Sequence, residues 1–279
     1  MKSIFTLLAP LVAVAFAAGA PAMAQPVESR AAQMSFADMV DLADGTPLVL
    51  RAQIKDQALV EPERSPGLAP GFARLYIEAR TSALITGTVP MGESLRYLVD
   101  VPLDAKGKVP KLKKQEVMLF ARPVPGRPGQ LQLVDPTAQF LYDPGFEARL
   151  RPVLSALLAQ DAPPVVTGIR DALTVEGTLV GESETQLFLD TRGDGPVSVT
   201  IVRRPNQAPR WGVSWTEIVD QSARAPQPGT LAWYRLACAL PERLPSDASL
   251  ARDSRVRAIT ARDYAFMLEQ LGPCTRNRG

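Results

Sequence analysis

The sequence predicts an α+β protein that is rich in β-structure. We expect a small curled sheet or barrel in the first half, and an antiparallel sheet with two or three helices in the second. Three observations lead to this fold class. Short segments alternate apolar and polar residues, 26 prolines and 19 glycines punctuate the chain, and helical spacing of apolar residues occurs in only a few segments of the 279 residues.

The first 24 residues have the pattern of a cleaved export signal. Lys2 precedes an apolar run from Ile4 to Ala18. Ala22-Met23-Ala24 then offers the small residues that a signal peptidase recognises, which places the cleavage between Ala24 and Gln25. A retained membrane anchor is the alternative, but it needs about 20 apolar residues, and Pro10 interrupts this shorter run. We therefore expect a periplasmic or extracellular protein without a membrane span after cleavage.

Residues 25–143 are expected to form a β-rich domain. One short helix follows Ser35 and ends at Asp44-Gly45. Five strands then follow from the alternation of apolar and polar residues, at 48–54, 73–79, 95–101, 117–121 and 131–134. The count resembles an oligonucleotide/oligosaccharide-binding barrel in architecture only, because we expect no helix between the third and fourth strands.

Residues 144–162 are expected to form a connecting helix. Asp143 is a good cap and Pro144 a good first residue. Pro152 should kink or split the helix. Its apolar stripe consists of Phe146, Leu150, Val153, Leu154, Leu157 and Leu158. Ala162-Pro163-Pro164 marks the boundary to a second domain.

Residues 163–279 are expected to form an α+β domain. Three strands lie at 173–180, 185–190 and 197–202, the last two joined by a hairpin turn around 192–195, and Trp211, Val213 and Trp215 belong to a fourth. One helix runs from Thr230 to about Leu240. Another presents Thr260, Tyr264, Met267, Leu268 and Leu271 on one face and ends at Gly272-Pro273.

Cys238 and Cys274 are the only cysteines. In an oxidising compartment an even pair indicates a disulfide, and two reduced, buried thiols are the alternative. Because the alpha carbons of a disulfide lie within about 7 Å, the carboxyl ends of the last two helices would have to meet.

The absence of histidine excludes several kinds of active site. A Ser-His-Asp triad, a Cys-His dyad and a His-Glu-x-x-His zinc site all require this residue. The net charge of +2 is too small to indicate binding to the negatively charged backbone of a nucleic acid. We expect no cofactor, no metal and no nucleic-acid partner.

A lysine-rich segment is one candidate for a ligand surface. It contains Lys106, Lys108, Lys111, Lys113 and Lys114. The segment suits phosphate or an acidic glycan, but a solvated loop before the fourth strand is the preferred explanation. Because no aromatic residue is interleaved, the segment does not support stacking on nucleic-acid bases.

Glu182 and Glu184 are candidates for paired carboxylates. On one strand they would share a face about 7 Å apart, a spacing compatible with glycosidases, although a polar turn explains them as well. Trp211 and Trp215 share a strand face and would suit a sugar if exposed, or the core if buried.

Four segments resemble those of uncharacterised exported proteins from alphaproteobacteria. They are Gly181–Gln186, Trp211–Val219, Trp233–Cys238 and Leu271–Cys274. The resemblance covers most of the mature chain. It implies no activity and assigns no functional residue.

We expect a non-catalytic periplasmic binding or envelope-assembly module whose partner is an envelope protein or a glycan. The alternative is a carboxylate-dependent enzyme that acts on envelope glycans. A binding module should expose an apolar or aromatic patch. An enzyme should instead have a cleft in which two or more acidic residues have displaced pKa values.

Overall fold

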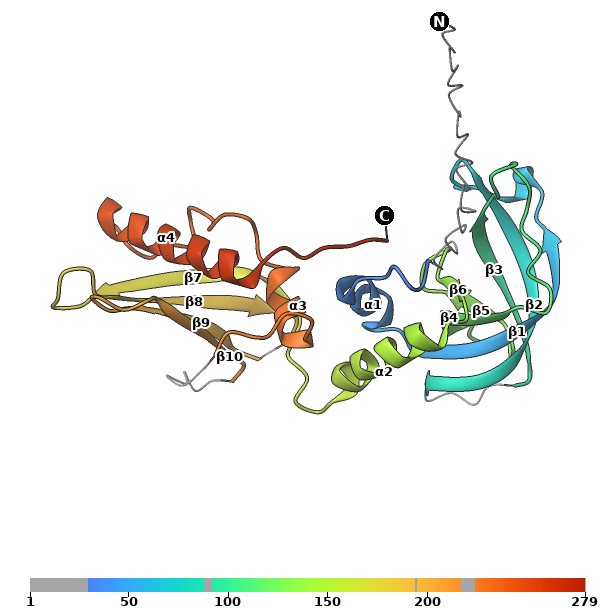
Figure 1. The fold of residues 1–279 in the computed structure, drawn as a ribbon, viewed down its shortest axis with the longest axis horizontal. Coiled ribbons are helices and arrows are strands. Elements are labelled where there is room, and N and C mark those ends of the chain that lie inside the picture. The colour runs from blue at the N-terminus through green and yellow to red at the C-terminus, as the bar shows by residue number, and fades with distance from the viewer. Residues whose placement is uncertain (1–29, 88–91, 194, 217–223, 279) are drawn as a thin grey trace, which may run out of the picture.

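The computed structural model describes residues 30–278 except 88–91, 194 and 217–223. The expected signal segment, with its cleavage site between Ala24 and Gln25, lies outside the described residues. Figure 1 shows the two sheets at opposite ends of the molecule, with helices between them. We call residues 30–158 the first unit and residues 166–271 the second unit, and residues 272–278 the C-terminal tail.

The first unit is built on a six-stranded antiparallel sheet. Its strands are β1 (Leu48–Leu59), β2 (Phe72–Gly87), β3 (Ser94–Pro102), β4 (Glu116–Pro123), β5 (Leu131–Leu133) and β6 (Gln139–Leu141). They follow the order β3-β2-β1-β4-β5, and β6 pairs with β4. A single 3-10 turn, η1 (Pro62–Arg64), lies between β1 and β2. The described loop between β3 and β4 contains no helix, as expected.

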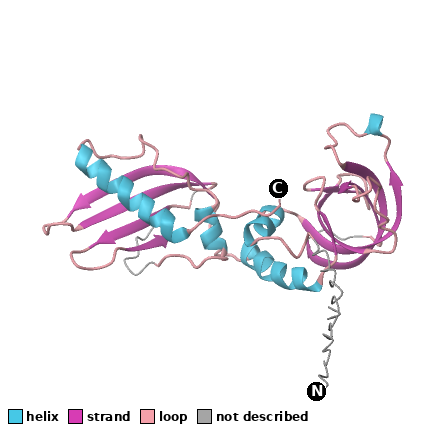
Figure 2. Ribbon diagram, turned by 45° about the horizontal axis from the view of Figure 1, so that its top comes forward, coloured by secondary structure: helices cyan, strands magenta, loops and turns pink. Residues whose placement is uncertain are grey.

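This sheet curls on itself, as Figure 2 shows. Three register shifts between β1 and β2 increase its bend, because bulges raise the local twist. The edges β3 and β5 approach each other, and the Arg96 N–H donates to the Gly129 carbonyl at 2.8 Å. Arg96 and Gln130 form only an isolated bridge, so the sheet is curled but is not a closed barrel. β6 was not predicted from the sequence.

Two helices flank this sheet, and both caps were predicted correctly. Ser35 and Asp38 form a capping box at the start of α1 (Phe36–Ala43). The Asp143 carboxylate accepts the Phe146 N–H at 2.7 Å at the start of α2 (Pro144–Leu158).

Pro152 does not split α2, because it lies inside one continuous helix. Pro152 and Ala148 are exposed, so water can reach the Ala148 carbonyl that Pro152 leaves without its donor. Leu158 was placed wrongly. It is the last residue of α2 and is 71% exposed, outside the buried stripe.

The second unit is a four-stranded antiparallel sheet with one long helix on one face. Its strands are β7 (Val166–Glu176), β8 (Ser183–Thr191), β9 (Val197–Arg203) and β10 (Arg210–Ser214), in the order β10-β9-β8-β7. β7 therefore begins and ends earlier than predicted. The helices are α3 (Leu231–Ala237), shorter than expected, and α4 (Ser254–Leu271). In the described part of the chain, no helix is long and apolar enough to cross a membrane.

Buried apolar residues form two clusters that correspond to the two units. The first draws on residues 31–154 and includes α2, with Leu231 of α3 added. The second draws on residues 166–271. Phe36 of α1 packs against both clusters. The exact domain limits, 25–143, 144–162 and 163–279, stay a prediction.

A buried polar network fastens α4 to the sheet of the second unit. Thr174 of β7 contacts Thr185 of β8 at 2.9 Å and Thr260 of α4 at 2.7 Å, in each case between hydroxyl oxygens. The Thr185 hydroxyl donates to Asp263 at 2.7 Å, and Arg203 of β9 pairs with the same carboxylate. Asp263 is completely buried, so its charge depends on these partners.

We predict that Asp263→Ala lowers the free energy of unfolding of the second unit by about 3 kcal/mol. The substitution leaves Arg203 without its buried carboxylate partner. Urea unfolding followed by tryptophan fluorescence tests this, because all three tryptophans lie in the second unit. Asp190→Ala, at an exposed position of β8, is the control and should change the value by less than about 0.5 kcal/mol. Equal effects of the two substitutions would contradict the role of Asp263.

Candidate functional site

One face of the second sheet is a candidate binding surface. Side chains alternate between the two faces of a strand, so Thr174 and Thr185 point towards α4, while their neighbours point away. On this opposite face, Leu173 and Val175 of β7 are 40% and 60% exposed. They pair across the sheet with Gln186 and Glu184 of β8. Exposed apolar side chains on a sheet face are a feature of interaction surfaces.

This face contains an open groove of about 520 Å³, next to the turn that joins β7 to β8. Its apolar floor consists of Leu173, Val175 and Val202. Gly177 and a set of polar and charged residues form the rest of the lining: Glu176, Thr178, Glu182, Ser183, Glu184, Gln186, Arg203 and Arg204. At the tip of the turn, Leu179 and Val180 are 59% and 99% exposed and extend the apolar surface.

The structure brings Glu182 and Glu184 together in the lining of this groove. Glu184 is exposed, and its carboxylate accepts a hydrogen bond from the Gln186 amide at 2.9 Å. Glu182 is half-buried; its side chain lies over Gly177, where a β-carbon would come within 2.2 Å of the Glu182 carboxylate. A glycosidase acid of raised pKa sits in an enclosed, apolar surrounding. The open groove provides no such enclosure.

The structure does not bring Trp211 and Trp215 to the groove. Trp211 of β10 pairs with the buried Ile201, on the same sheet face as α4. Trp215 follows the end of β10, and both tryptophans are half-buried and pack against the second cluster. They therefore belong with the core rather than with the groove.

The lysine-rich segment forms an exposed loop between β3 and β4 of the first unit. All five lysines are exposed. Lys113 pairs with Asp56 of β1 at 3.2 Å, and Lys114 has φ 71°, in the left-handed region. The segment contributes nothing to the lining of the groove.

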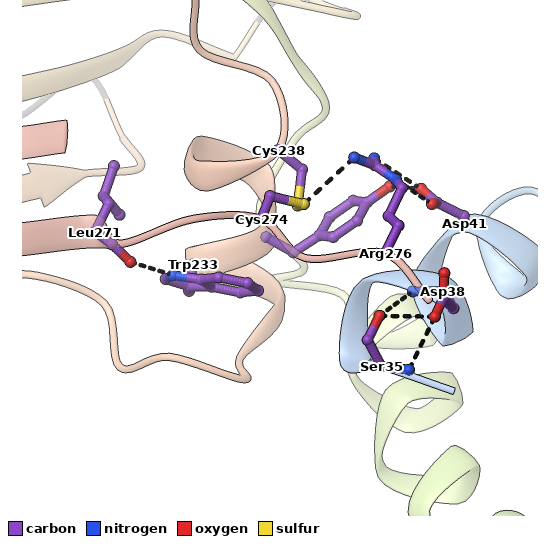
Figure 3. The surroundings of a disulfide bond; sticks show 9 residues. Ser35, Asp38, Asp41, Trp233, Cys238, Leu271, Cys274 and Arg276 are labelled. Carbon is purple, nitrogen blue, oxygen red and sulfur yellow. Dashed lines mark hydrogen bonds and ion pairs between the residues drawn. A yellow bond between two sulfur atoms is a disulfide. The ribbon is translucent and has the colours of Figure 1, made fainter. Parts of the chain in front are cut away.

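Cys238 and Cys274 form a disulfide with a separation of 5.1 Å between alpha carbons. Cys238 is the cap that ends α3, and Cys274 follows the end of α4. The carboxyl ends of the two helices therefore meet, as the pairing required. The bond ties the C-terminal tail, at Cys274, to the end of α3, as Figure 3 shows.

The C-terminal tail reaches α1 of the first unit, a contact that sequence reasoning missed. Arg276 contacts the Asp41 carboxylate at 2.6 and 3.2 Å and also donates to the Cys274 sulfur at 3.4 Å. The backbone N–H groups of Asn277 and Arg278 donate to the Asp38 carboxylate at 2.9 and 3.2 Å. Figure 3 places Asp38 and Asp41 on the α1 side that faces the tail.

Helix α3 adds two further contacts to α1. Arg235 pairs with Asp44 at 2.6 Å, and the Tyr234 hydroxyl donates to Asp41. Burial, followed by this hydrogen bond to Asp41, raises the pKa of Tyr234 to about 12. The spacing Asp38, Asp41, Asp44 is the signal that could have revealed an acidic helix face.

Neither a candidate metal site nor a similarity to known proteins indicates what this groove does. Within residues 30–278, apart from the undescribed gaps, no three metal-ligating side chains gather into a site. No protein-family model matches the chain, and no curated protein is similar to it. The resemblance to exported alphaproteobacterial proteins therefore stays a prediction.

We predict that the tail loosens from α1 in acid. Burial by itself would raise the pKa of Asp38, but hydrogen bonds from Asn277, Ser35 and Arg278 outweigh it and lower the pKa. The contact is therefore complete above about pH 3.9, the usual value for aspartate, and is lost as the pH falls through the lowered pKa. The NMR shifts of the Asn277 and Arg278 amides should share one midpoint below pH 3.9.

Asp38→Asn is the matched control for this titration, because it removes the ionising group and should abolish the shared midpoint. The Phe120 amide, in the first cluster, reports whether the fold survives at each pH. A midpoint at or above pH 3.9, or one that Asp38→Asn leaves in place, would refute the assignment.

We predict that the Cys238→Ser, Cys274→Ser double variant loses about 4 kcal/mol of free energy of unfolding. The estimate follows from the chain entropy that a cross-link over 36 residues removes from the unfolded state. Urea unfolding measures this loss. Alkylation of the wild-type protein without reductant, followed by intact mass, should label no thiol; two labelled sites would show that the disulfide is absent.

Proposed function

We propose that this chain is an exported, non-catalytic binding module that uses the groove of its second unit to bind another protein of the cell envelope. The observation that carries the proposal is the exposed apolar floor, Leu173 and Val175 with Val202, on a sheet face that α4 leaves uncovered. Burying such a floor against a partner removes apolar surface from water and so favours association.

Export is the part of the proposal that rests on the sequence. The leader has the pattern of a signal peptide, and the disulfide between Cys238 and Cys274 is the kind of bond that persists in an oxidising compartment. Both observations support a periplasmic location.

A carboxylate-dependent enzyme acting on envelope glycans is the second candidate. One observation favours it, namely that Glu182 and Glu184 lie in the same groove. The exposed position of Glu184 and the open groove favour binding, since an acid of raised pKa needs an enclosed position.

A photo-crosslinking residue at Val175, introduced in the native host, tests the proposal. We expect the envelope fraction to contain a crosslinked product that protease digestion destroys and muramidase digestion leaves intact. The same residue at Leu98, which is 49% exposed on the first unit, is the control and should give no product.

The product at Val175 should also disappear when Leu173→Asp places a charge on the groove floor. A product that only muramidase removes would favour the glycan enzyme. If Val175 gives no specific product, the groove is not a binding site and the proposal is wrong.

A further inference from the structure

The charged groups around the groove separate into a paired set and an unpaired set. Glu176 and Arg203 belong to the face that α4 covers, where Arg203 pairs with Asp263 and Glu176 pairs with Arg255 at 3.1 Å. Glu182, Glu184 and Arg204 belong to the groove face. Among the described residues none of these three has an ion-pair partner, so the unpaired charges of the groove lining sum to one negative charge.

Glu184 lies in the middle of an apolar row. The strand register places Val175 of β7 opposite Glu184, and Glu184 opposite Val202 of β9. Side chains opposite each other on neighbouring strands are about 5 Å apart, so both valines flank the carboxylate. The row thus places apolar, anionic and apolar groups on three neighbouring strands. Arg210 of β10 follows Val202 on the fourth strand and lies outside the groove lining.

Lysine and arginine side chains complement such a row. Their aliphatic stems bury against apolar surface while the cationic end keeps a polar contact. A lysine or arginine whose cation pairs with Glu184 would place its aliphatic stem over Val175 or Val202. The other valine would then be free to contact an apolar side chain of the same segment. An anionic partner would meet the excess negative charge instead and would leave Glu184 without a counter-ion.

Resting on the proposed function, we infer that the groove binds an extended segment of a partner protein that combines apolar side chains with lysine or arginine. The cation of that segment pairs with Glu184, and its apolar side chains cover Leu173, Val175 and Val202. A groove of about 520 Å³ holds a few side chains, which suits a short segment rather than a folded domain.

Three synthetic five-residue peptides test this inference: valine alternating with lysine, with glutamine and with glutamate. Each is titrated into the complete mature protein, and binding is followed by the NMR shifts of its amides. We expect the lysine peptide to shift groove residues such as Leu173, Glu184 and Val202, and its affinity to fall with added salt. The glutamine and glutamate peptides should bind at least about fivefold more weakly.

Glu184→Gln should reduce the affinity of the lysine peptide about fivefold, because it removes the charge and retains the shape of the side chain. Asp190→Asn is the matched control, since Asp190 lies on the same strand and face but outside the groove lining, and it should change nothing. Equal binding of all three peptides in the groove would overturn the charge preference and leave the binding module standing. Shifts elsewhere, or no binding by any peptide, would overturn this inference, while crosslinking at Val175 decides the binding module separately.

Discussion

Two aspartates of α1, Asp38 and Asp41, and Asp44, which caps the end of this helix, hold the two units of this protein together. Asp38 accepts the last backbone N–H groups of the described tail, Asp41 binds Arg276, and Asp44 binds Arg235. Apolar contacts support them, among them the edge-to-face packing of Phe36 on Trp233, with ring centroids 6.3 Å apart, and the burial of Leu231 in the first cluster. Since surface ion pairs are individually weak, the attachment depends on their number and on the disulfide that fixes where the tail begins.

The same arrangement determines which surfaces stay open. The Cys238–Cys274 bond joins α3 to the end of α4, so the two helices and the tail form one connected structure. The network around Asp263 then commits α4 to a single face of the sheet. With four strands and one long helix, the second unit can cover only that face. The groove face is left exposed as a consequence of how the helices are fastened.

Local signals in the sequence predicted most of the elements. The alternation of apolar and polar residues predicted the strands at 48–54 and 73–79. Ser35 and Asp143 predicted where α1 and α2 begin, and the two cysteines predicted the disulfide. The contacts of Asp38 were beyond reach, because Asn277 lies 239 residues away along the chain. The groove was also hidden. The sequence identified Glu182 and Glu184 as candidate carboxylates. The apolar residues of the groove belong to other strands, and only the strand register shows that Val175 and Val202 lie next to Glu184.

The way in which β7 ends the sheet bears on how a partner would bind. An open edge strand invites pairing with another chain, but the Ala172 N–H donates to Ala248 at 2.7 Å and its carbonyl accepts from Leu250 at 3.0 Å. Strand addition is therefore obstructed at that point, whereas the face beside it stays accessible. Because Glu184 divides the apolar floor, non-specific apolar contacts there would bury a carboxylate without a counter-ion. Under the proposed function, a segment that supplies a cation covers the floor without this cost, so the position of Glu184 favours such a segment over a purely apolar one.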